Sequence, residues 1–207
     1  MITIIDYEMG NLRSVEKAFE SLGFAARVSA DPADIPRADK LVLPGVGAFA
    51  DCVNNLRAGG FVAPLLEHVE SAKPLLGICV GMQMLFDESE EFGRHQGLGL
   101  IPGRVVRFPS GMVENGERLK VPHMGWNTIS FRQDAPLFRG IDDGSYVYFV
   151  HSYHCQADNE ADIAASCTYG DVTFCASLWR GNIMATQFHP EKSQEIGLRI
   201  FRNFGAL

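Results

Sequence analysis

The stretch that most constrains the fold of this chain is Pro74–Phe86, PLLGICVGMQMLF. It opens with a short apolar run typical of a buried strand, and Cys79 follows between Gly77 and Gly81. Beyond the cysteine, apolar residues recur at helical spacing. Strand, tight turn and helix in this order predict an elbow that leaves the thiol at the edge of a sheet, as in the serine motif G-x-S-x-G. At a helix N-terminus, partial positive charge favours the thiolate.

A second stretch, Ala185–Glu191, is an extended run that ends in His-Pro-Glu. Side chains two residues apart in an extended segment point the same way, and a proline keeps its predecessor out of the helical region. His189 and Glu191 can then project together, which suits a general base and the carboxylate that orients it. Each motif alone also fits a simpler interpretation, a buried cysteine or a surface ion pair. Together they predict a catalytic triad of Cys79, His189 and Glu191.

The sequences around these residues, GICVGMQ and FHPEKS, resemble the paired signatures of the class I glutamine amidotransferases. The resemblance implies a domain that hydrolyses L-glutamine to glutamate and hands the ammonia to a partner. Three more stretches, IIDYEMGNLRSVEKAFE, LPGVGAF and VPHMGWN, are similar to the glutaminase subunits of imidazole glycerol phosphate synthase within that family. The implied partner is a (β/α)₈ cyclase subunit, and the implied heterodimer makes imidazole glycerol phosphate and AICAR in histidine biosynthesis.

Apolar and turn patterns along the first half of the chain predict βαβ order. The expected strands are 2–5, 26–28, 40–43 and the elbow strand, and the expected helices cover residues 12–22, 50–58 and 62–72. Residues 87–103 are charged and glycine-rich and are expected to form a loop. Gly23 is the expected stop of the first helix.

The second half contains short β-rich runs, a hairpin at Arg180-Gly181-Asn182 and a closing helix over residues 191–204. With the resemblance, this indicates an α/β, three-layer class I glutamine amidotransferase fold. Its central sheet is expected to be mostly parallel, flanked by helices, with an antiparallel β extension in the second half. We expect one glutamine amidotransferase domain spanning residues 1–207.

The segment Pro44–Gly47 follows a strand that should lie beside the elbow strand. Its two glycines let the backbone approach a substrate closely and aim N–H groups at it. We expect the amide groups of Gly47 and Val80 to form an oxyanion hole for the intermediate produced by attack of Cys79. A plain strand-to-helix turn is the alternative. We further expect the backbone of this segment to be poorly oriented for catalysis until a partner and its ligand bind.

Substrate-binding positions follow mainly from the resemblance. Gln83 stands one helical turn beyond the nucleophile and is implied to contact the amino acid end of glutamine. Backbone groups of Ser152 and Tyr153 are implied to bind the α-carboxylate, and Gly45 is placed with them in the substrate site. Without the resemblance, Gln83 would be a solvated helix residue.

Three residues are candidates for the partner interface. The resemblance places Trp126 and Tyr148 toward the synthase partner, although each could equally be a core aromatic residue on a strand. Lys192 follows the triad glutamate, and both an interface contact and an ordinary surface lysine fit it.

Composition bounds the remaining function classes. The 207 residues carry a formal charge of −7, which gives no basic patch for nucleic acid or an acidic membrane surface. No signal-like segment or membrane span is visible, so a cytoplasmic protein is expected. Five irregularly spaced cysteines argue against a disulfide framework, and without a C-x-x-C or a convincing ligand cluster neither a metal nor a cofactor is expected.

Two alternatives keep the fold and change the function. One is the glutaminase subunit of a different synthase, making anthranilate or pyridoxal phosphate, and the GNLRS and VPHMGWN stretches speak against it. The other is a non-catalytic subunit, against which the complete set of three triad residues argues. A hydrolase or peptidase of the α/β-hydrolase type is disfavoured because there the acid precedes the histidine in the chain.

Overall fold

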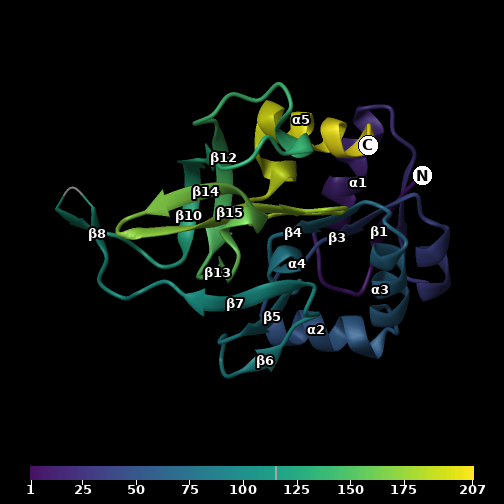
Figure 1. Cartoon of the computed structure of the whole chain (residues 1–207), viewed down its shortest axis with the longest axis horizontal. Coiled ribbons are helices and arrows are strands. Elements are labelled where there is room, and N and C mark those ends of the chain that lie inside the picture. Colours follow the sequence, from purple (N-terminus) through teal and green to yellow (C-terminus); the bar gives the residue numbers. More distant parts are fainter. Residues whose placement is uncertain (115) are drawn as a thin grey trace.

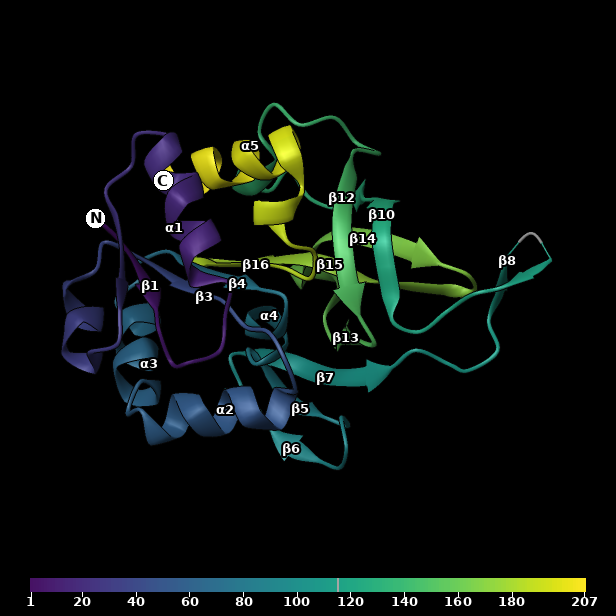
Figure 2. The same cartoon turned by 180° about the vertical axis from the view of Figure 1, so that it is seen from behind.

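The computed structural model describes residues 1–114 and 116–207. One sheet runs through the molecule, and helices cover both of its faces at one end (Figure 1). Helices α1 (Leu12–Ser21) and α5 (Gln194–Gly205) pack together on one face, and α2 (Phe49–Ala58) and α3 (Val62–Glu70) lie on the other (Figures 1 and 2). This arrangement forms the three expected layers.

One half of the sheet is parallel, in the order β2-β1-β3-β4-β16. Its strands are β1 (Ile2–Ile5), β2 (Ala26–Ser29), β3 (Lys40–Leu43), β4 (Leu75–Ile78) and β16 (Ile183–Thr186). Every residue of β1, β4 and β16 is buried. Strands covered by helices on both faces read as continuous apolar runs, which is why the sequence located them well.

The other half is largely antiparallel and continues from β16 through β15, β13 and β7. The remaining strands are β5 (Phe86–Ser89), β6 (His95–Gln96), β7 (Ile101–Arg107), β11 (Ser130–Phe131), β13 (Tyr153–Ala157), β14 (Ile163–Tyr169) and β15 (Val172–Arg180). Two smaller antiparallel sheets stand apart, β10 (His123–Thr128) with β12 (Tyr146–His151) and β8 (Val113–Glu114) with β9 (Glu117–Arg118). The expected parallel core with an antiparallel extension is confirmed.

The predicted helices are confirmed to within a few residues at their ends. Gly23 has φ +84°, the left-handed conformation expected after α1. The closing helix begins later than expected, because Pro190–Lys192 forms the short 3₁₀ turn η4. The other 3₁₀ turns are η1 (Pro32–Arg37), η2 (Pro136–Phe138) and η3 (Glu160–Asp162). Among the described residues, no helix has the length and apolar character needed to cross a membrane.

Two expectations around the elbow were wrong. The elbow helix α4 is a single turn, Val80–Gln83, and Phe86 opens strand β5 instead of extending the helix. The carbonyl groups of Met84 and Leu85 accept hydrogen bonds from the 98–101 backbone, so they cannot accept from a continuing helix. Residues 87–103 are therefore not a plain loop. They include β5, β6 and the start of β7, held by pairing between strands rather than by β-forming residue types.

Candidate active site

Cys79 stands at the tight bend between β4 and α4. Its φ of 56° and ψ of −113° lie in a strained region for a residue with a side chain. Its N–H donates to the carbonyl of Thr186 (2.8 Å) on the adjacent strand β16. A Cβ at Gly81 would lie 1.9 Å from the carbonyl oxygen of Leu43, so only glycine allows β3 to approach the elbow this closely. The predicted elbow is confirmed, and the surrounding backbone fixes its shape.

The predicted contribution of a helix N-terminus is small, because α4 has only four residues. The groups that face the thiol are side chains instead. Gln187 Nε2 lies 3.8 Å from Cys79 Sγ. His189 lies in side-chain contact with the thiol.

His189 and Glu191 come together as the His-Pro-Glu spacing predicted. Nδ1 of His189 lies 2.8 Å from Glu191 Oε1, and both side chains are almost fully buried. The backbone of His189 is held on both sides: its N–H donates to the carbonyl of Tyr148, and its carbonyl accepts from the Ser193 hydroxyl (2.7 Å). Because Nδ1 faces the carboxylate, Nε2 is left for the thiol side.

The pKa of His189 reflects two opposing effects. Burial lowers it, whereas hydrogen bonds to, and negative charge on, the Cys79 sulfur and the Glu191 carboxylate favour the protonated ring. The contacts win, and the pKa rises from 6.5 to about 10. At neutral pH the ring carries a proton while it faces the sulfur atom.

A pocket of about 410 Å³ opens over Cys79. Of the residues predicted from the sequence, it is lined by Gly47, Cys79, Val80, Gln83, Ser152, Tyr153, His189 and Lys192. The chain thus brings together residues more than a hundred positions apart. Glu191 lies behind His189, and Gly45 is buried against the elbow, where a Cβ would lie 2.6 Å from the Gly81 nitrogen.

The two predicted oxyanion donors, Gly47 and Val80, differ in whether the N–H group is already hydrogen-bonded within the protein. Gly47 lines the pocket with φ +99° and is exposed. The N–H of Val80 instead donates to the carbonyl of Gly45, at the long distance of 3.3 Å. One expected donor is therefore already engaged by the loop that should supply the other.

Gln83 is buried, so its interpretation as a solvated helix residue is wrong. Its Nε2 lies 3.1 Å from the Tyr153 carbonyl and 3.0 Å from Oε1 of Gln187. Gln187 was not predicted, although it stands two residues before His189 in an extended run and so shares its side. That spacing is the signal that could have revealed it.

Glu91 is a second pocket residue that the sequence did not reveal. Its Oε2 accepts from the N–H of Phe49 (2.6 Å) at the start of α2, and its side chain lines the pocket. It belongs to the region expected to be a loop, so no periodicity pointed to it. The carboxylate gives the pocket a negative group that suits an ammonium ion.

The three candidate interface residues lie together. Trp126 is 46% exposed, so it is not a core residue, and its ring lies 6.0 Å from that of Tyr148. Nζ of Lys192 lies 5.8 Å from the Tyr148 ring centroid, within cation–π range. The Trp126 and Tyr148 rings meet edge to face, so the exposed tryptophan is part of a small aromatic surface.

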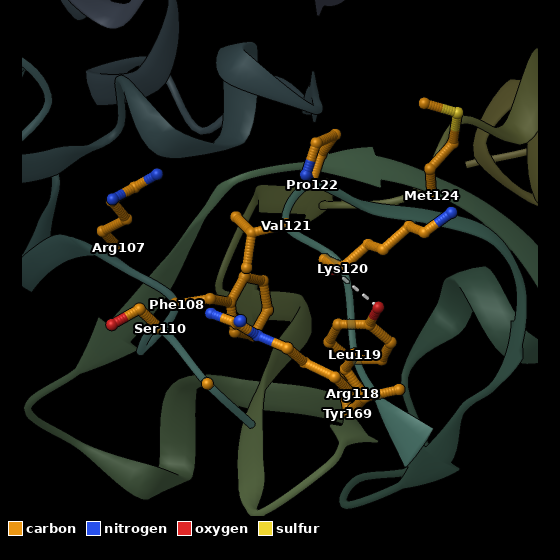
Figure 3. A pocket seen from close by; sticks show the side chains of 11 residues that line it. Arg107, Phe108, Ser110, Arg118, Leu119, Lys120, Val121, Pro122, Met124 and Tyr169 are labelled. Atoms are coloured by element: carbon orange, nitrogen blue, oxygen red, sulfur yellow. Dashed lines mark hydrogen bonds between the residues drawn. The ribbon is translucent and has the colours of Figure 1, made fainter. Parts of the chain in front are cut away.

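A larger cavity, of about 970 Å³, is lined by the segment before β10 and by Met124 of that strand, and Cys79 is not part of its lining. It shares Pro122 with the Cys79 pocket, and Arg107, Arg118 and Lys120 contribute basic side chains to its lining (Figure 3). The hydroxyl of Tyr169 donates to the Lys120 carbonyl (2.7 Å). None of its residues were predicted as substrate-binding.

The sequence matches the family model described as glutamine amidotransferase class-I over residues 3–206. It is 65% identical over 205 residues to a protein of Syntrophotalea carbinolica named imidazole glycerol phosphate synthase subunit HisH, covering 99% of each chain. The protein of the same name from Geobacter sulfurreducens is 60% identical over 206 residues, covering 100% of this chain and 98% of that one.

Solved structures share the fold at lower identity. A structure described as glutamine amidotransferase superposes with a TM-score of 0.75 at 19% identity, covering all of both chains. PurLQS from Thermotoga maritima gives 0.73 at 19% identity, covering 98% of this chain and 96% of that one. The fold, the elbow and these matches agree: the chain belongs to the class I glutamine amidotransferase family.

Proposed function

We propose that this chain is the glutaminase subunit of an imidazole glycerol phosphate synthase. The observation that carries the proposal is the identity of 65% along 99% of the chain with a protein of that name, together with a cysteine and a histidine that line one pocket and a glutamate that contacts the histidine. The chain would act as one domain over residues 1–207 in the cytoplasm. Its ammonia would enter a cyclase that makes imidazole glycerol phosphate and AICAR.

In the proposed reaction, His189 holds the proton of the Cys79 thiol, and Cys79 Sγ attacks the side-chain amide carbon of glutamine as a thiolate. The carbonyl oxygen becomes an oxyanion, and His189 gives its proton to the amide nitrogen. The C–N bond breaks, ammonia leaves and a γ-glutamyl thioester remains. Water then attacks the thioester as His189 takes its proton, the C–S bond breaks, and glutamate leaves. Glu191 holds the imidazole tautomer throughout, as its 2.8 Å contact with Nδ1 supports.

The pocket supplies groups for both ends of the amino acid. We assign Gln83 and the backbone of Ser152 and Tyr153 to the amino acid end of glutamine, with the α-carboxylate at the latter two. Glu91 is the carboxylate that would balance the α-ammonium group. Gly45 would act behind the elbow, through the loop that it anchors.

The oxyanion hole would be completed only when the Pro44–Gly47 segment moves. Gly47 and Val80 are the proposed donors, and the Val80 N–H is occupied by the Gly45 carbonyl at 3.3 Å. That bond is long and therefore weak. Docking of a partner that releases it would free the donor, so we expect low basal turnover and activation in the complex.

We place the (β/α)₈ cyclase against the surface formed by Trp126, Tyr148 and Lys192, giving a heterodimer. The Trp126 ring meets the Tyr148 ring edge to face, Lys192 lies over the Tyr148 ring, and Lys192 lines the pocket. The backbone of Tyr148 also bonds His189 directly, and its N–H donates to the Ser193 hydroxyl (3.0 Å). Contact at this surface can therefore reach the base of the reaction.

The test is a glutaminase assay of the subunit alone, then with a co-purified cyclase, then with the nucleotide-derived substrate of that cyclase added. We expect turnover to rise at each step and Cys79→Ala to abolish it. Equal turnover with and without the partner would refute the activation. A pull-down that recovered a chorismate-using enzyme would assign the chain to another synthase.

A further inference from the structure

A chain of side-chain hydrogen bonds runs from β10 to the end of β12, where His151 lines the Cys79 pocket. Nδ1 of His151 lies 2.8 Å from the carbonyl oxygen of Tyr153. Its Nε2 lies 3.1 Å from Nδ1 of His123, and Nδ2 of Asn127 lies 3.3 Å from the other nitrogen of His123. Both rings are buried. The chain occupies every ring nitrogen of the two histidines.

The protons in this chain can be assigned. A carbonyl oxygen only accepts, so Nδ1 of His151 carries the proton. Burial lowers the pKa of His151 to about 3 and that of His123 to about 4, so both rings are neutral at pH 7. Nε2 of His151 therefore accepts from Nδ1–H of His123, whose own Nε2 accepts from the Asn127 amide. The chain runs in one direction and ends on Tyr153.

The Tyr153 carbonyl also receives a bond from the nucleophile side. It accepts from Gln83 Nε2 (3.1 Å), which in turn bonds Oε1 of Gln187 (3.0 Å). Gln187 lies 3.8 Å from Cys79 Sγ. One carbonyl thus joins the histidine chain to the groups around the thiol, and the neighbouring carbonyl of Ser152 is held by the N–H of Phe108.

We propose that His151 and His123 are positioning residues of the glutaminase. They hold the Ser152–Tyr153 segment in the orientation that binds the α-carboxylate of glutamine, and they tie that orientation to strand β10. The inference rests on the proposed function and deepens it. His151 lines the pocket, but the four nitrogens of the two rings are all hydrogen-bonded within the protein, so neither ring is left to transfer a proton to the substrate.

The aromatic cluster around these rings contains a control residue that distinguishes a positioning role from a packing role. His154 packs in the same cluster, 4.6 Å from the ring of Phe108 and 5.8 Å from that of Phe174, and is as buried as His123. It stands outside the hydrogen-bond chain, and its Nδ1 has no partner among the described residues. His154 is therefore a matched control that packs in the cluster and takes no part in the hydrogen-bond chain.

The experiment uses two substitutions at one position, measured in the complex with the cyclase. In His151→Asn the side-chain amide falls near the position of Nδ1 and can still donate to Tyr153, whereas in His151→Gln it falls near Nε2 and that donor is lost. We expect H151Q to raise the KM for glutamine about tenfold with kcat changed less than about twofold. H151N should raise KM less than about threefold. His154→Leu should lower the melting temperature and leave KM unchanged.

A substrate without the α-carboxylate sharpens the test. With L-glutaminamide, the KM values of wild type and H151Q should differ by less than about twofold. This substrate has no α-carboxylate, so neither enzyme can make the contact that the two histidines are proposed to position. Equal effects of H151N and H151Q, or an equal loss with both substrates, would overturn the positioning role.

A third variant covers failure of H151Q to fold. His123→Phe keeps the stacking on Phe149 (4.8 Å) and Tyr169 (4.1 Å) but removes the donor to His151. It should raise KM about threefold, and an unchanged KM would overturn the inference. A wild-type complex without glutaminase activity would refute the proposed function instead, so the two failures are distinguishable.

Discussion

His189 and a second group of buried histidines, His123, His151 and His154, differ in charge. His189 is 3% exposed, and its pKa is raised to about 10. His123, His151 and His154 are buried to a similar degree, 3 to 6% exposed, yet their pKa values are lowered to about 4, 3 and 4. Equal burial thus gives opposite protonation states.

The difference comes from what each ring faces. Burial lowers the pKa in every case, but only His189 contacts a carboxylate and a thiol that favour its protonated form. The other three face aromatic rings, a backbone carbonyl and one another. Burial therefore favours the neutral ring, and a charged partner can reverse this preference. The first ring suits proton transfer, and the others suit fixed hydrogen bonds.

Removal of the thiol should have the largest effect. Cys79→Ala should lower glutaminase activity at least about 10⁴-fold, because no other group supplies the nucleophile. It should also lower the pKa of His189, since one of its two favourable contacts is lost. Histidine NMR titration and the coupled assay measure both. Cys167→Ala, another buried thiol outside the pocket, is the control, and an equal loss there would contradict the assignment.

Removing the charge of Glu191 should bring the pKa of His189 closer to the lowered values of the three neutral histidines. Glu191→Gln keeps the size of the side chain and should lower kcat about 10²- to 10³-fold, because the imidazolium loses its counter-charge. The pKa of His189 should fall with it. Glu195→Gln, an exposed change on α5, should leave kcat alone. A kcat within tenfold of wild type, about 1.4 kcal/mol, would show that Glu191 only packs.

Acid should destabilise the folded protein through the three neutral histidines, His123, His151 and His154. A pKa lowered on folding means that the unfolded state binds protons first, so stability is full above about pH 6.5 and falls toward pH 4. Each histidine contributes a slope of up to about 1.4 kcal/mol per pH unit. His189 has the opposite sign, and its contribution is lost as pH rises through about 10. Urea unfolding between pH 5 and 8 measures the slope.

One variant isolates a single member of that group. His154→Leu should make the dependence of the unfolding free energy on pH shallower below pH 6.5, because one titrating site is removed. The same slope in this variant and in wild type would show that His154 is not neutral in the folded state.

The smallest effect should come from placing a carboxylate beside one of the three neutral histidines. Asn127→Asp places a negative charge near Nε2 of His123 and should raise the pKa of that ring above about 4. The aspartate cannot donate to the Thr168 carbonyl, which costs about 1 kcal/mol at pH 8. The cost should shrink near pH 5, where the ring protonates and pairs. Asn127→Ala should show no such recovery in urea unfolding.

Much of the first half of the fold could be predicted from the sequence. Parallel strands buried on both faces give unbroken apolar runs, and β3 ends at Leu43 as expected, whereas β4 continues past Gly77 to Ile78. The elbow followed from glycines flanking Cys79, and closeness of His189 to Glu191 followed from their spacing. Strand β5 could not be predicted, because FDES has little β propensity and is held by β7.

The substrate side of the pocket was harder to predict for the same kind of reason. Glu91 reaches the pocket from a turn with no period, and Gln83 is buried only because Gln187 and the Tyr153 carbonyl satisfy its amide. A polar side chain in a short helix carries no sign of whether a distant partner exists. The exposure of Trp126 was open for a similar reason, since strand patterns do not say what covers a face.

The sequence by itself determined the reactive residues and the elbow that presents one of them, because these depend on local spacing and on glycine. Only the tertiary structure decided how the histidines are charged and which carbonyl unites them. His123 and His151 are 28 residues apart, and Gln187 is 108 residues from Cys79. The pKa of a buried ring and the direction of its hydrogen bonds depend on neighbours that folding alone brings within reach.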